Sequence, residues 1–420
     1  MVDRKYIVLA CLTCCAGIAY IQRAAMSVPA ADIARDLQFA ELETQMGWIQ
    51  FTWYFCYGLM QIPSGWLADR YGSRRTLAAL CTLWSVATFL SGFATGFASL
   101  LVLWGLMGAA QAGAFPCAAK AIGQLLPDRQ RARANGVLAS GMLIGGAIAP
   151  LLTAAALRSL MPMSNAWGID PWRLLLCAYA IPGVVWTVAF LLLVSARTLP
   201  TVSGNATEHK HQVDWLRLVQ SPSMGLLCAQ QFFRAAGMVF FVTWFPTFLL
   251  KTREVSLLGS GAMTTIVGLG GVVGSLTGGL FSDWLLKRTG NQRLSRQGIA
   301  ILGMSVCSAL IVCAFFVVDA NASIALISLG VFFATFGGVS GYTVAIQFGG
   351  RYVATVFSTM NMCGNMGAAL FPLVAAKLVT STGNWNLMLL LFAFIMAIDA
   401  VCWALLNPKG TLFGDENESS

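Results

Sequence analysis

The chain has 420 residues, of which 57% are hydrophobic and 10% are charged, and its net charge is +9. Soluble domains carry about 25% charged residues, so this composition excludes a soluble globular protein and indicates a membrane protein with many spans. The basic residues form short clusters between apolar runs rather than one patch, which excludes a nucleic-acid-binding face.

Apolar segments recur along the whole chain, and each is long enough to cross a ~30 Å hydrocarbon core as a helix. The first runs from Tyr6 to Pro29 after a short basic start. Because many more follow, we interpret it as a retained span rather than a cleaved signal. The other spans are predicted at 46–67, 76–97, 100–125, 136–157, 172–195, 222–249, 258–281, 298–318, 323–347, 353–378 and 386–406. The sequence therefore predicts an all-α membrane protein with twelve transmembrane helices.

The longest polar stretch separates the sixth span from the seventh and divides the chain into halves. We predict an N-terminal six-helix bundle at 1–195, a cytoplasmic linker at 196–221, a C-terminal six-helix bundle at 222–406 and a cytoplasmic tail at 407–420. Most of the 26 Lys and Arg residues fall on the side of the amino terminus. The positive-inside rule then places both termini in the cytoplasm, and we expect a monomer in the cell (inner) membrane.

Small residues and cysteines within the spans have structural explanations. Gly141 and Gly145 in span five, and Gly274 and Gly278 in span eight, predict helices that approach closely. The 12 cysteines lie largely in apolar segments, and the one C-x-x-C pair, at 11 and 14, is best explained by packing. We therefore expect no metal site and no cofactor.

A short basic sequence after span two, Gly-Trp-Leu-Ala-Asp-Arg-Tyr-Gly-Ser-Arg-Arg at 65–75, has a degraded copy after span eight at 279–288. Such a repeat indicates two related halves. The first copy resembles the signature loop of the major facilitator superfamily, which implies two pseudo-symmetric six-helix bundles. We expect the charged residues of the two copies and of the 126–135 segment to form a cytoplasmic latch that must break during transport: Asp69, Arg70, Arg74, Arg133 and Asp283.

Four further motifs point to one branch of that superfamily: Tyr-Ile-Gln-Arg at 20–23, Tyr-x-x-x-Gln-Ile-Pro-x-Gly at 57–65, Gly-x-Phe-Pro at 113–116 and Trp-Phe-Pro-Thr at 244–247. They resemble the anion:cation symporter family. This resemblance implies a secondary transporter that moves small organic anions, such as sugar acids, by alternating access and often with a proton. Family members usually carry acids where this chain has Gln22 and Gln111, so the co-transport of a proton or of another cation stays open.

Two arginines within spans are the main candidates for binding an anion. Arg23 in span one and Arg234 in span seven each place a costly charge inside the membrane. A guanidinium suits a carboxylate because its planar fork donates two charge-assisted hydrogen bonds. The alternatives are snorkelling for Arg23, and a structural pair with a carbonyl or Asp399 for Arg234. One anion that met both would draw the halves together.

Uncharged polar side chains could complete the site. We predict substrate contacts from Gln22, Gln111, Tyr57, Asn361 and Asn365, with hydrogen bonds or aromatic packing between helices as the alternative. Asp399 is the one acid well inside a predicted span, so it is either a coupling residue or a structural counter-ion.

Three other classes of function are less compatible with the sequence. An enzyme would cluster His, Asp or Glu within spans, but no predicted span contains a histidine. A non-transporting membrane sensor on the same fold would usually add a soluble domain. A carrier or exporter of a neutral or drug-like compound remains the alternative among carriers, although Arg23 and Arg234 would repel a cationic cargo.

Overall fold

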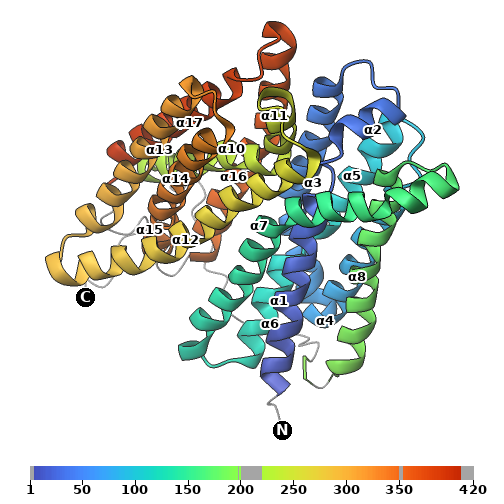
Figure 1. The fold of residues 1–420 in the computed structure, drawn as a ribbon. Helices are drawn as coiled ribbons and strands as arrows, with labels where there is room; N and C mark the ends of the chain where they lie inside the picture. The colour runs from blue at the N-terminus through green and yellow to red at the C-terminus, as the bar shows by residue number, and fades with distance from the viewer. Residues whose placement is uncertain (1–3, 197, 200–219, 350–352, 408–420) are drawn as a thin grey trace. The chain divides into compact units, whose positions relative to one another are not determined.

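The computed structural model (Figure 1) describes residues 4–196, 198–199, 220–349 and 353–407, and within these ranges the regular secondary structure is helical. The helices are α1 (Arg4–Arg23), α2 (Ala30–Asp36), α3 (Leu42–Tyr71), α4 (Ser73–Ser91), α5 (Phe97–Gln111), α6 (Ala114–Leu125), α7 (Asp128–Trp167), α8 (Pro171–Leu193), α10 (Pro222–Thr243), α11 (Phe245–Thr252), α12 (Leu257–Thr289), η1 (Arg293–Gly298), α13 (Ile299–Phe316), α14 (Ala320–Gly338), α15 (Ser340–Gly349), α16 (Val353–Thr382) and α17 (Leu387–Leu405). Most of the predicted linker and tail lies outside the described residues.

Helix length and hydropathy agree with a chain that crosses the membrane many times. Ten helical segments among the described residues are long and apolar enough to span a bilayer. The other two predicted spans, 46–67 and 76–97, coincide with the long helices α3 and α4. The prediction of an all-α, multi-span membrane protein is therefore confirmed.

Three predicted spans are each formed by two consecutive helices. Span four is α5 followed by α6, span seven is α10 followed by α11, and span ten is α14 followed by α15. The breaks lie beside residues that interrupt helices, Gly113 in span four and Pro246 in span seven. The predicted spans cover both helices of each pair, but the apolar pattern did not indicate the interruptions within them.

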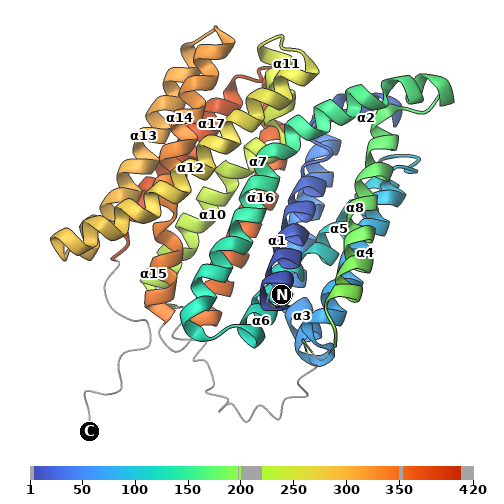
Figure 2. The same ribbon diagram turned by 60° about the horizontal axis from the view of Figure 1, so that its bottom comes forward.

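The chain forms two compact units. The N-terminal unit comprises Met1–Thr207 with Val242–Leu250 and Glu254–Thr265, and the C-terminal unit comprises Glu208–Phe241, Lys251–Arg253 and Ile266–Ser420. In the N-terminal unit α1 packs against α7, α3 against α5, and α4 against α8. In the C-terminal unit α13 packs between α14 and α17, and Figure 2 shows α13 and α14 running side by side. The domain boundaries predicted from sequence remain predictions.

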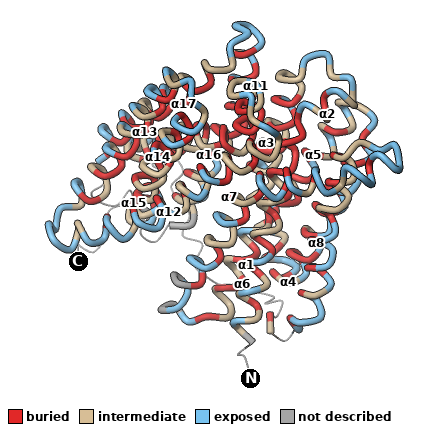
Figure 3. The backbone as a smooth tube through the Cα atoms, viewed as in Figure 1, coloured by how far each residue is buried: buried red, intermediate tan, exposed pale blue. Residues whose placement is uncertain are grey.

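The long helices bury one face and leave apolar side chains exposed on the other. In α8 the buried positions, such as Trp172, Leu176 and Phe190, recur at helical spacing, while Leu192 is 80% exposed. Figure 3 shows the same mixture of buried and exposed positions along the long helices. Exposed leucine and valine on a helix of this length are what a lipid-facing surface requires.

Glycines set the closest approaches between helices. A Cβ at Gly145 of α7 would lie 2.7 Å from the carbonyl oxygen of Gly17 in α1. A Cβ at Gly274 or Gly278 of α12 would collide with the carbonyl oxygens of Phe332 and Phe336 in α14. The predicted close helix contacts at these glycines are confirmed.

Candidate functional site

Arg23 is the last residue of α1, and its guanidinium lies against three aromatic rings. The guanidinium carbon is 4.3 Å from the ring centre of Tyr20, 4.3 Å from that of Trp53 and 5.0 Å from that of Tyr57. Helical spacing produces this arrangement, because Tyr20 precedes Arg23 by three residues and Trp53 precedes Tyr57 by four. We call Tyr20, Trp53 and Tyr57 the aromatic cage.

The aromatic cage holds the charge without saturating its hydrogen-bond donors. Each ring face attracts a cation, typically with about 0.5–2 kcal/mol. The Trp53 and Tyr57 rings stack at 5.0 Å, and Trp53 is buried. The Nε atom of Arg23 is also buried and has no hydrogen-bond partner. A rigid guanidinium with an unused donor is a group that can receive a carboxylate or sulfonate.

Gln22 and Gln111 are buried in the same unit and bond to other helices. The Gln22 side chain donates from Nε2 to the carbonyl of Tyr179 at 2.6 Å, and that of Gln111 donates to the carbonyl of Ala19 at 3.3 Å. Both Oε1 atoms are buried without a hydrogen-bond partner. The bonds observed are those of the packing alternative, and a contact with substrate remains a prediction for both residues.

Arg234 lies in α10 of the C-terminal unit and has a comparable but more polar environment. Its Nη2 donates to Oε1 of Gln231, one turn earlier, and its guanidinium carbon is 5.2 Å from the ring centre of Tyr342 in α15. A Cβ at Gly338 would lie 3.0 Å from Cδ of Arg234, so the side chain packs against that glycine. The Nε atom is buried without a partner, as in Arg23.

Asn361 and Asn365 occupy one face of α16, as their spacing predicts. The amide of Asn365 donates to the main-chain carbonyl of Asn361 at 2.9 Å, and both side chains are half-buried. In the same helix, Gly364 packs against Gln231 of α10. The asparagines therefore lie on a helix that contacts the neighbour of Arg234, while their contact with substrate stays a prediction.

Asp399 in α17 is completely buried, and neither carboxylate oxygen has a hydrogen-bond partner. Among the ion pairs of the described residues, none joins Asp399 to Arg234 within 4.0 Å. The alternative of a direct structural pair between these two residues is therefore not what the structure contains.

The residues predicted to form a latch lie near the ends of different helices. Arg74 of α4 donates to the carbonyls of Val194 and Leu191, at the end of α8. Arg70 is exposed and lies over the rings of Trp66 and Tyr71. The side chains of Asp69 and Arg133 are outside the described part of the structure.

The second copy of the basic motif does not form a loop. Residues 279–288 belong to α12, which continues to Thr289. There Asp283 accepts a hydrogen bond from Nη2 of Arg296 at 2.8 Å, while Nη1 of Arg296 donates to Ser282 at 2.6 Å. The first copy does turn, because Gly72 has φ +83°, a conformation that favours glycine, and separates α3 from α4. In the second copy the turn comes after the motif, at Gly290, which has φ +63°.

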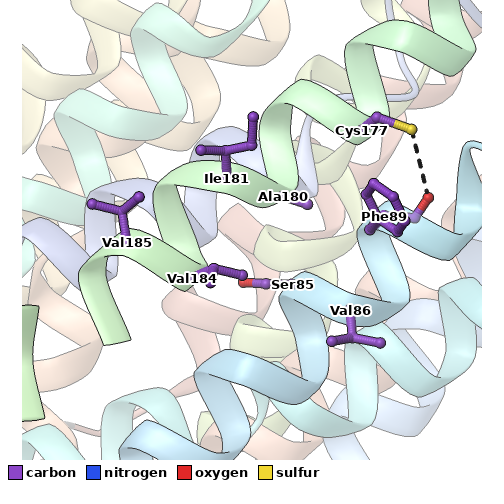
Figure 4. A pocket seen from close by; sticks show the side chains of 8 residues that line it. All are labelled: Ser85, Val86, Phe89, Cys177, Ala180, Ile181, Val184 and Val185. Carbon is purple, nitrogen blue, oxygen red and sulfur yellow. Dashed lines mark hydrogen bonds between the residues drawn. The ribbon is translucent and has the colours of Figure 1, made fainter. Parts of the chain in front are cut away.

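A surface groove of the N-terminal unit lies between α4 and α8 and is apolar. It encloses about 340 Å³, and Figure 4 shows its lining: Ser85, Val86, Phe89, Cys177, Ala180, Ile181, Val184 and Val185. The one hydrogen bond drawn there runs from the thiol of Cys177 to the carbonyl of Phe89. No charged side chain lines this groove, so it lacks the donors that an anion requires.

Sequence reasoning missed two aromatic neighbours of the arginines. Tyr20 belongs to a motif already identified, and its spacing of three from Arg23 could have indicated the contact. Tyr342 lies in a different helix from Arg234, and no periodicity within one helix links the two. Its one sequence signal is a tyrosine flanked by glycine inside an apolar span.

Comparisons with known proteins agree on a single family. The sequence profile of the Major Facilitator Superfamily matches residues 12–350. The chain is 27% identical to a probable sulfoacetate transporter of Cupriavidus necator, over 98% of this chain and 96% of that protein. It is also 27% identical to a probable galactarate/D-glucarate transporter of Escherichia coli, over 96% and 94% of the two chains.

A solved structure has the same fold. A bacterial homologue of the human lysosomal transporter Spinster, in an inward-facing and unoccupied conformation, aligns with a TM-score of 0.76 at 18% identity. The alignment covers 97% of both chains. At this identity the likeness concerns the fold alone.

Proposed function

Because the chain belongs to the major facilitator superfamily, we propose that it is a secondary transporter that carries a small organic anion through the membrane by alternating access. The substrate is a sugar acid or another compact carboxylate. Two of the relatives are named as probable transporters of sulfoacetate and of galactarate and D-glucarate, and each of these compounds carries at least one strong anionic group. The chain's role is transport rather than catalysis.

The observation that carries the proposal is Arg23 in its aromatic cage. A charged side chain within a membrane span is costly, by at least about 2.5–3.5 kcal/mol on insertion scales. Here the side chain points into the protein against three rings, instead of extending freely toward headgroups. Its buried, unpartnered Nε favours an anionic guest over a structural role.

The remaining predicted residues take supporting roles in this proposal. Arg234 and Tyr342 provide the anion contact of the C-terminal unit, and Tyr57, Gln22, Gln111, Asn361 and Asn365 meet the hydroxyl groups of the substrate. Asp69, Arg70, Arg74, Arg133 and Asp283 act in the latch on the cytoplasmic side. The protein acts as a monomer in the inner membrane, with both termini in the cytoplasm.

A pairwise substrate comparison tests this function. Purified protein in proteoliposomes is assayed for uptake of galactarate and of galactitol, which has the same carbon chain with alcohols in place of the carboxylates. The proposal predicts saturable uptake of galactarate, D-glucarate or sulfoacetate, and no saturable uptake of galactitol. Transport of galactitol with no preference for any of the acids would contradict it and would favour a carrier of neutral compounds.

A further inference from the structure

Asp399 is the described acid that is most completely removed from solvent. Its exposure is 0%, and both carboxylate oxygens lack a hydrogen-bond donor. A buried ionised carboxylate without a donor or an ion-pair partner costs several kcal/mol, and such a group takes up a proton instead. In the conformation described here, the surroundings of Asp399 therefore favour the neutral, protonated carboxylic acid.

Arg234 is the charged group that acts on Asp399. The two side chains interact electrostatically. Among the ion pairs of the described residues, however, none brings a guanidinium nitrogen of Arg234 within 4.0 Å of a carboxylate oxygen of Asp399. The helices that carry them contact each other nearby, where Gly237, one turn after Arg234 in α10, packs against Met396, one turn before Asp399 in α17. The Nε atom of Arg234 is likewise buried and unpartnered. A buried acid and a half-buried guanidinium thus lie close together, each with a buried polar atom that has no hydrogen-bond partner.

The other groups that face Asp399 do not replace Arg234. The thiols of Cys307 in α13 and Cys402 in α17 also interact with Asp399, but a neutral thiol supplies no positive charge. In the packed element η1, Arg296 is engaged by Asp283, and in α16 the side chain of Lys377 is exposed. The charge balance at Asp399 therefore depends on Arg234.

Resting on the proposed function, we infer that Asp399 is the proton-binding residue of this transporter and that Arg234 links its protonation to the binding of the anion. A proton from water adds to a carboxylate oxygen of Asp399 before or with substrate entry, and leaves as a proton on the opposite side. This proton site lies in the C-terminal unit, whereas Gln22 and Gln111, which carry no charge, lie in the N-terminal unit.

The linkage follows from the charges alone. When Asp399 is ionised, it attracts the Arg234 guanidinium and competes with an external anion. When Asp399 is protonated, that competition ends and the guanidinium is available to substrate. By reciprocity, an anion bound at Arg234 removes the positive neighbour that favours the ionised acid, so proton binding and anion binding strengthen each other. This is the thermodynamic requirement for symport.

The test separates coupling from transport with the variant Asp399→Asn, which copies the shape of the protonated acid. In proteoliposomes, uptake of D-glucarate is measured with an inward proton gradient, and exchange of labelled for unlabelled D-glucarate is measured without one. We expect the gradient to raise uptake by the parent protein at least fivefold and to leave Asp399→Asn unchanged, while exchange by this variant stays within threefold of the parent. Asp32→Asn, the same change at a partly exposed acid, serves as the matched control and should behave like the parent.

Three outcomes overturn the inference: gradient-driven uptake by Asp399→Asn equal to that of the parent, no response of the parent to the gradient, or loss of coupling in Asp32→Asn as well. If Asp399→Asn shows no exchange, the inference is tested instead with Asp399→Glu, by the pH dependence of D-glucarate uptake. A shifted pH midpoint of D-glucarate uptake supports proton binding at this position, and an unchanged midpoint contradicts it. Absence of uptake of galactarate, D-glucarate and sulfoacetate by the parent overturns the proposed function, and this inference with it.

Discussion

At the scale of single residues, the structure gives Arg23 a defined environment. Snorkelling would place the guanidinium in water or among headgroups, but three aromatic rings lie within 5.0 Å of it. The spacing of residues 20–23 and 53–57 was visible in the sequence, so part of this cage could be predicted. The pairing of the two segments could not, because α1 and α3 are separated in sequence by α2.

The role of the Tyr57 hydroxyl can be tested with substrates that differ in hydroxyl content. Tyr57→Phe keeps the ring over Arg23 but removes the hydroxyl. We expect the KM for galactarate to rise about three- to tenfold, the equivalent of one hydrogen bond of about 0.5–1.5 kcal/mol. The KM for sulfoacetate, which has no hydroxyl group, should change less than twofold. Uptake kinetics for both substrates provide the measurement, and an equal rise in both KM values would contradict a hydroxyl contact.

At the scale of helices, the sequence predicted where close packing occurs but not where helices break. Glycine patterns identified the contacts of Gly145 and Gly278 because a missing side chain is visible in the sequence. The interruptions between α5 and α6, or between α14 and α15, fall inside apolar runs whose hydropathy does not change. Such breaks depend on how neighbouring helices satisfy the backbone, which the sequence pattern does not report.

The close contact of Gly278 in α12 with Phe336 in α14 predicts that a larger side chain at position 278 destabilises the protein. Gly278→Val would push a branched side chain into the backbone of Phe336. Overpacking of this kind costs about 1–3 kcal/mol, so the midpoint of thermal unfolding in detergent should fall by several degrees.

The matched control for that change is Gly225→Ala in α10, where an added Cβ meets no atom within 4 Å. This variant should unfold at the same temperature as the parent or slightly higher, because alanine favours a helix by about 1 kcal/mol over glycine. Equal unfolding temperatures for the Gly278 variant and the parent would show that α12 and α14 do not need their close contact.

At the scale of the whole molecule, composition and span count were sufficient to predict a multi-span helical protein. The motif at 65–75 predicted the family, and the match over residues 12–350 confirms it. The candidate site was harder to predict, because Tyr342 packs against Arg234, and Asp399 acts on it electrostatically, from helices that are distant in sequence. The sequence identified the charged residues within the spans as functional candidates. The neighbours that determine their chemistry could be identified only from the structure.

Binding of D-glucarate to purified protein, measured by calorimetric titration, tests the central claim that Arg23 receives the anion. We expect Arg23→Lys to raise Kd about 10- to 100-fold, since hydrogen bonds to charged groups contribute about 1.5–3 kcal/mol. Arg23→Gln should abolish measurable binding. Arg35→Gln, at an arginine whose side chain is 74% exposed, should leave Kd unchanged. Unaltered D-glucarate affinity in Arg23→Gln would contradict the account.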